Sequence, residues 1–148
     1  MDDWFEHTKL HRAAEAGDLN LVRALLNQGC PVNAFDELGK TPLHYAVLGE
    51  HFAVIESLLR FGADVNAHDE RVIGNTPLGE AASTCSLRMA QFLAEAGADP
   101  TIPGWMQLTA LDLAERRRHE EGTGSEGQAV FNLLKEAAEK RSQRKRKR

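Results

Sequence analysis

The side chains that could carry chemistry in this 148-residue chain are chiefly its six histidines and two cysteines. A zinc-binding helix needs two histidines four residues apart with an acidic residue nearby, and His7 and His11 have that spacing. His11, however, has a counterpart in His44 further along the chain, and a threonine stands three positions before each of these two histidines. A recurring position of this kind points to a structural role, so we expect no metal site and no cofactor.

Cys30 and Cys85 are candidates for a nucleophile or a disulfide. Neither has a histidine or a glycine-rich oxyanion segment close to it in sequence, and they form no Cys-x-x-Cys pair. The chain also lacks a phosphate-binding Gly-x-x-x-x-Gly-Lys motif. We therefore expect a protein of a reducing compartment that is not an enzyme. The alternative, a hydrolase or metalloenzyme, would need catalytic partners that folding brings together.

Residues 41–66 show the elements that would position such side chains. Thr41 is suited to cap a helix, and Pro42 fits the first helical position, where a missing N–H costs nothing. Apolar residues recur at helical spacing over 52–59, and Gly62 then supplies the left-handed residue that ends a helix. Helices of about ten residues are not stable alone in water, so others must stack against them.

The same pattern recurs along the chain. A threonine stands at each expected helix start, and a glycine follows each of the first three threonines at one constant spacing. These residues are Thr8, Thr41, Thr76 and Thr109, with Gly29, Gly62 and Gly97. A period of roughly 33 residues that begins with Thr-Pro-Leu-His and ends with Gly-Ala-Asp-Val-Asn resembles the ankyrin repeat.

The resemblance implies an all-α fold, an ankyrin-repeat solenoid of stacked helix-turn-helix units with projecting β-hairpin-like fingers. It implies one ankyrin-repeat domain over residues 1–139, with repeats at approximately 5–37, 38–72, 73–105 and 106–139. In this family the rings of His11 and His44 would form hydrogen bonds within and between repeats, and His51 would lie at the turn between helices. Trp4 and Phe5 would cover the end of the first repeat; the alternative is that they anchor a partner.

The family's pattern implies a non-catalytic protein-protein interaction module, acting as an adaptor, an inhibitor or an accessory subunit. The partner would contact the concave surface that fingers and first helices form. The candidate residues are Glu37, Leu38, Lys40, Tyr45, Leu48, Glu70, Arg71, Val72, Ile73, Asn75, Glu80, Trp105 and Met106.

Two fingers stand out among these candidates. The finger at 67–75 is two residues longer than its predecessor, and we favour a partner contact for Val72 and Ile73. In the last finger, Trp105 and Met106 either contact a partner or fold back over the fourth repeat. Aromatic residues are enriched at interface hot spots, but these observations leave both alternatives open.

Charge divides the chain into two parts. Residues 140–148 hold seven of the 18 Lys and Arg and no acid, whereas the rest of the chain holds all 22 Asp and Glu, a balance of −11. We expect the tail to be disordered because it has nothing apolar to bury. Residues 116–127, which interrupt the fourth repeat, predict a flexible insertion. The acidic body predicts a protein partner with a basic patch and makes nucleic acid an unlikely one.

The alternative function is a nuclear or nucleic-acid-associated regulator that uses the basic tail. The amino terminus lacks the features of a signal peptide, and no apolar run reaches the length of a membrane span. We expect a cytoplasmic protein, with the nucleus as the alternative location, that is monomeric on its own.

Overall fold

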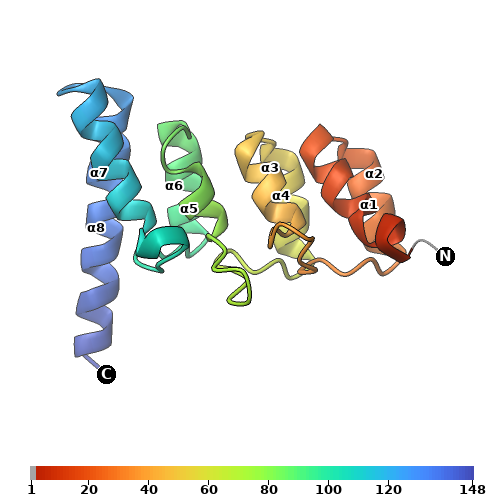
Figure 1. Cartoon of the computed structure of the whole chain (residues 1–148). Helices are drawn as coiled ribbons and strands as arrows, with labels where there is room; N and C mark the ends of the chain where they lie inside the picture. Colours follow the sequence, from red (N-terminus) through yellow and green to blue (C-terminus); the bar gives the residue numbers. More distant parts are fainter. Residues whose placement is uncertain (1–2) are drawn as a thin grey trace. The chain divides into compact units, whose positions relative to one another are not determined.

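The computed structural model describes the backbone from residue 3 to residue 148 and the side chains from Thr8 onward. The side chains of Trp4 and Phe5, for which the sequence predicts a cap or an anchor, lie outside the described ones. The described residues form eight α-helices and one short 3-10 turn, with no strand among them (Figure 1). The all-α repeat architecture is therefore confirmed. Contacts group the chain into two compact units, the first ending at Pro77 and the second spanning Leu78–Arg148.

The first unit contains two helix-turn-helix repeats. The first repeat pairs α1 (Asp3–Ala16) with α2 (Leu19–Asn27), and the second pairs α3 (Pro42–Leu48) with α4 (Phe52–Arg60). First helix packs on first helix and second on second, so α1 lies against α3 and α2 against α4. The core between them is apolar and includes Leu10, Ala14, Val22, Leu43, Val47, Val54, Ile55 and Leu58.

His44 connects this second repeat to the finger that follows it. The fully buried ring accepts the N–H of Thr41 at Nδ1 (3.0 Å) and lies 2.9 Å from the Thr41 hydroxyl. Its Nε2 is 2.7 Å from the carbonyl oxygen of Asn75, which can only accept, so the ring proton is on Nε2. The predicted role of His44 within and between repeats is confirmed.

His51 has the predicted place at the turn between helices. Its Nε2 donates to the carbonyl oxygen of Glu15 in the preceding repeat, at 3.0 Å. A Cβ atom on Gly17 would lie 2.5 Å from the ring, and Gly17 has a φ of +70°. Both the space and the conformation therefore require glycine at this position.

His11 differs from His44 because α1 starts earlier than the repeat pattern predicts. Lys9 replaces the proline that limits α3, so the helix continues back to Asp3 and Thr8 lies inside it. His11 Nε2 still lies 2.8 Å from Ala34 O and 3.1 Å from Lys40 O. Its Nδ1, however, is buried without a hydrogen-bond partner in the described part of the chain. His11 therefore has only part of the role that His44 has.

The second unit begins within α5 (Pro77–Ala81) and continues with α6 (Leu87–Glu95). A 3-10 turn, η1 (Trp105–Gln107), precedes the last two helices, α7 (Ala110–Glu121) and α8 (Glu126–Arg146). α8 packs against both α6 and α7. The core of this unit includes Met89, Ala90, Leu93, Ala114, Val130 and Leu134.

Arg117 holds together the segment that the sequence predicts to be a flexible insertion. Its nearly buried guanidinium donates to Cys85 O (2.7 Å) and to Glu121 Oε1 (2.6 Å). Glu121 Oε2 in turn accepts the N–H of Gly127 (2.7 Å), at the start of α8. The hydrogen bond from Arg117, followed by that from Gly127, lowers the pKa of Glu121. Residues 116–121 are therefore part of α7, and only 122–125 form a loop.

The basic tail also differs from its prediction, because α8 continues to Arg146. Arg141 Nε lies 3.2 Å from Asp99 Oδ2, and its Nη1 donates to Gly97 O at 3.2 Å. Burial tends to raise the pKa of Asp99, but hydrogen bonds from Thr101 and the nearby charges of Arg141 and Lys145 lower it overall. Cations in the last turns also interact favourably with the helix dipole, which explains helix where composition alone predicts disorder.

His44→Leu tests the role of the buried imidazole. The substitution leaves the Thr41 N–H and the Asn75 carbonyl without this partner, so we expect a loss of about 2–3 kcal/mol in the free energy of unfolding. Chemical denaturation of the full chain measures it. His51→Leu, which removes one hydrogen bond from a half-buried ring, is the matched control and should cost about 1 kcal/mol. Equal losses would contradict the assigned role.

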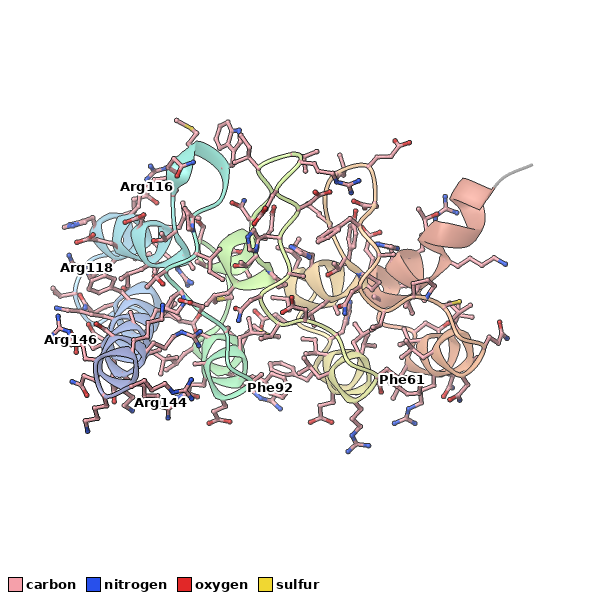
Figure 2. All side chains as sticks on the ribbon, turned by 90° about the horizontal axis from the view of Figure 1, so that it is seen from below. Phe61, Phe92, Arg116, Arg118, Arg144 and Arg146 are labelled. Carbon is pink, nitrogen blue, oxygen red and sulfur yellow. The ribbon has the colours of Figure 1, made fainter. Side chains whose placement is uncertain are left out.

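Arg117→Met tests the Arg117–Glu121 network. The buried Cys85 carbonyl would lose this donor, and we expect a loss of about 2 kcal/mol in stability. Arg116→Met is the control, since Arg116 extends from the same helix into solvent (Figure 2) and should change stability by less than about 0.5 kcal/mol. Thermal unfolding of both variants compares them, and an unchanged Arg117 variant would show that the network is dispensable.

Candidate protein-binding surface

The first finger, residues 34–40, is closed by Asp36. Asp36 Oδ1 accepts the N–H groups of Leu38 and Lys40, both at 2.9 Å, and the Asp36 N–H donates to Lys40 O at 2.9 Å. These bonds fix a tight turn that leaves Glu37 exposed and Leu38 68% exposed. The first finger therefore presents an apolar side chain from a fixed backbone.

The second finger, residues 67–75, is closed in a related way by Asp69. Asp69 Oδ1 accepts the Arg71 N–H at 3.0 Å, and the Arg71 guanidinium contacts both carboxylate oxygens at 3.0 Å. The hydrogen bond from the Arg71 side chain is the main reason that the pKa of Asp69 lies below its ordinary value. Arg71 thus remains exposed, as predicted for a contact residue, and also fixes its own finger.

The two fingers contact each other at their tips. A Cβ atom on Gly39 would lie 2.4 Å from Val72 Cγ2, so the Val72 methyl group rests on the backbone of the first finger. Val72 and Ile73 are nevertheless 49% and 55% exposed. Both fingers extend from the same end of the helices of the first unit (Figure 1). We call Leu38, Val72 and Ile73 the apolar tip.

Ile73 has a backbone conformation that β-branched residues rarely adopt. Its φ is +53°, in the left-handed region. Such a conformation costs about 1–3 kcal/mol and persists only where surrounding contacts enforce it. Here Gly74 N–H donates to Asp69 O at 2.9 Å and holds the turn. The structure thus keeps an exposed apolar side chain in a strained position.

Behind the first finger, Tyr45 and Lys40 are less exposed than the sequence predicts. The Tyr45 hydroxyl donates to the Asp36 carboxylate, and its ring meets the His11 ring edge-on at 6.1 Å. Lys40 Nζ lies 5.7 Å from the centre of the same ring. Leu48, on the same helix as Tyr45, is 43% exposed. Asn75 is half-buried, with its carbonyl bound to His44.

In the second unit, Trp105 and Met106 are 63% and 66% exposed. The alternative in which they fold back over the fourth repeat is therefore not the one observed. Gly104 N–H donates to Leu108 O at 2.9 Å and closes the turn, while Met106 has a φ of +58°. Glu80, in α5, is half-buried.

Sequence reasoning missed two residues around the first finger, Asp36 and His11. The repeat pattern indicates Asp36 only as part of the finger, yet this residue fixes the backbone and binds Tyr45. The available signal is an aspartate two residues before the tip, because this residue type closes turns through its own side chain. For His11 the signal is Lys9 in place of proline.

The described residues contain no group of three or more His, Cys, Asp or Glu side chains able to hold a metal ion. Within the same residues, every helix is too short or too polar to cross a membrane.

Fold and surface together define a helical-repeat scaffold that presents side chains from short loops. Comparison with known families identifies the repeat: residues 1–69 match a model described as ankyrin repeats (3 copies), and residues 73–105 match the single ankyrin repeat. The chain belongs to the ankyrin repeat family. Ankyrin repeats are generally protein-protein interaction modules without catalytic activity, and the matched families are not enzyme families.

Two relatives show how local the similarity is. The chain is 52% identical over 42 residues to an ankyrin and IPT/TIG repeat-containing protein of Schizosaccharomyces pombe, covering 28% of this chain and 4% of that protein. It is 47% identical over 38 residues to a fowlpox virus protein named as a putative ankyrin repeat protein, covering 26% of this chain and 27% of the relative. The matches therefore span about one repeat and only small parts of those proteins.

Arg71→Gln tests the electrostatics of the second finger. Because Arg71 lowers the pKa of Asp69, the pair supports the finger above the unfolded pKa of Asp69 and is lost as pH falls through the folded value. The variant should raise the pKa of Asp69 toward its ordinary value. Carboxyl-carbon NMR titration measures it, with Glu70→Gln as the neighbouring control. An unchanged Asp69 titration in the Arg71 variant would contradict the assignment.

Proposed function

We propose that this protein binds another protein through the fingers and first helices of its first unit, as an adaptor, inhibitor or accessory subunit. The observation that carries the proposal is the apolar tip, three exposed aliphatic side chains on two fingers that contact each other. Exposed apolar groups that gather in this way favour association because their burial removes them from water.

The rigidity of the tip supports recognition by a preformed surface. Each finger is closed by its own aspartate, and the strained φ of Ile73 is held by the turn around it. A surface that is already ordered loses little conformational entropy when a partner binds. The strain at Ile73 is the kind of local cost that functional sites tend to contain.

Charge gives the partner's chemistry. The body of the chain carries a balance of −11 outside its last nine residues, and Glu37 and Glu70 stand exposed on the two fingers. A partner with a basic patch would meet complementary potential, and its association rate would fall as salt rises. Trp105 and Met106 provide a separate exposed pair in the second unit, which we propose as an additional contact.

The test is binding by a double variant of the tip, Leu38→Ala with Ile73→Ala. A partner is first captured from lysate of the source cells at low and high salt, identified and purified. Its affinity for the tip variant should fall by about tenfold or more, since two anchors of the kind that dominate interfaces are lost. The control Leu21→Ala changes a leucine that is 45% exposed on α2, away from the fingers, and should bind normally.

A Trp105→Ala, Met106→Ala variant, compared in the same assay, reports on the additional contact. If the partner binds the tip variant and the intact protein equally, the proposed surface is wrong.

The end of α8 favours a second candidate, association with nucleic acid. Arg144 and Arg146 lie on its last turns (Figure 2), and residues 142–148 are exposed. Such a cation array would bind phosphates with a steep salt dependence. Deleting 143–148 tests it, because this truncation keeps Arg141 and its bonds to Asp99 and Gly97. Protein binding should survive the deletion under the first proposal, and any nucleic-acid binding should be lost under the second.

A further inference from the structure

We propose that a pocket beside the first finger accepts a lysine or arginine side chain of the protein partner. The pocket has a volume of about 360 Å³ and lies among α1, the first finger and α3. This inference rests on the proposed function and names the chemical group that the same surface would select. The residues that line it are Thr8, His11, Arg12, Glu15, Asp36, Glu37, Leu38 and Tyr45.

The first argument is an unsatisfied acceptor in the wall of the pocket. His11 is 4% exposed, and its Nε2 faces two carbonyl oxygens, those of Ala34 and Lys40. Carbonyl oxygens only accept, so the proton of the neutral ring lies on Nε2 and leaves a lone pair on Nδ1. That Nδ1 has no partner among the described residues, whereas Nδ1 of His44 accepts from Thr41. A hydrogen-bond donor is therefore the group that the pocket lacks.

The second argument is charge. Three carboxylates line the pocket, those of Glu15, Asp36 and Glu37, against one guanidinium, that of Arg12. Asp36 already accepts bonds from the Tyr45 hydroxyl and from two backbone N–H groups. Each carboxylate oxygen can accept more than one bond, so Asp36 can still receive a further donor. A cation is attracted to this lining and an anion is repelled.

The third argument is shape and apolar surface. Leu38 and the Tyr45 ring supply apolar wall for the methylene groups of a long side chain. Lys40 Nζ already lies 5.7 Å from the centre of the Tyr45 ring, a cation–π arrangement within the same site. A neutral aromatic side chain would cover the carboxylates without giving them a donor, which is unfavourable. Lysine and arginine supply an aliphatic stem, a positive charge and several N–H donors together.

The experiment uses the full chain and small probes, so it does not depend on an identified partner. Blocked lysine and arginine (Nα-acetyl amides) are titrated in the millimolar range, with blocked norleucine and glutamate as controls. Two NMR signals are followed: the backbone amides of 34–40 and the Nδ1 nitrogen of His11. We expect saturable shifts with both basic probes and a His11 Nδ1 shift toward the hydrogen-bonded value. Norleucine and glutamate should produce neither.

A matched pair of variants separates the pocket from the general acidity of the chain. Glu15→Gln with Glu37→Gln changes two exposed carboxylates of the lining and should weaken binding of the basic probes by roughly tenfold. Glu56→Gln, an exposed acid on α4 outside the pocket, should leave their affinity unchanged. Equal binding of norleucine, an unmoved His11 Nδ1, or equal loss in the Glu56 variant would overturn the inference.

The two proposals fail in different ways. Absence of probe binding, with partner binding still lost in the Leu38 and Ile73 variant, removes the pocket and leaves the apolar tip as the binding surface. Probe binding, with a partner indifferent to that same variant, leaves the pocket without the function on which it rests and so overturns the proposal in its present form.

Discussion

A hydrogen bond from a buried imidazole to the backbone of the next finger is the constraint on which the first unit depends. His44 reaches Asn75 O, and His11 reaches Ala34 O and Lys40 O, in each case joining a helix to a segment distant in sequence. A finger has few apolar contacts of its own, so this connection to a packed helix is what fixes its position. The aspartates at the finger turns then determine how the tips are shaped.

This arrangement explains how short helices can support a recognition surface. The helices pack into a core that holds the imidazoles, the imidazoles hold the fingers, and the fingers hold Leu38, Val72 and Ile73 in solvent. Packing and exposure are thereby assigned to different residues of each repeat. Substitution at the tips can change the partner without weakening the stack, which is consistent with a family that serves generally in protein-protein interaction.

The sequence predicted the elements whose causes are local. Thr41 and Pro42 mark the start of α3, and Gly62, with a φ of +91°, ends the second helix of its repeat as expected. Of the candidate site, the sequence identified the exposed apolar residues correctly but overestimated the exposure of Tyr45 and Lys40. Their partners, Asp36 and the ring face, come from folding and leave no mark on spacing.

What the sequence could not show depends on contacts between distant segments. Arg117 binds the carbonyl of Cys85, far from it in sequence, and this bond turns an apparent linker into helix. Likewise, Arg141 binds Gly97 O and Asp99, and the helix continues into a tail whose composition suggests disorder. The left-handed conformations of Ile73 and Met106 also contradict residue preference and arise from the turns that enclose them.

Hydrogen–deuterium exchange of the full chain with and without its purified partner tests the central claim most directly, because it reports on every segment at once. The account predicts that the partner slows exchange in 34–40 and 67–75, while α2 and α4 change little. Protection confined to the second helices or to 142–148, with both fingers exchanging as in the free protein, would contradict it.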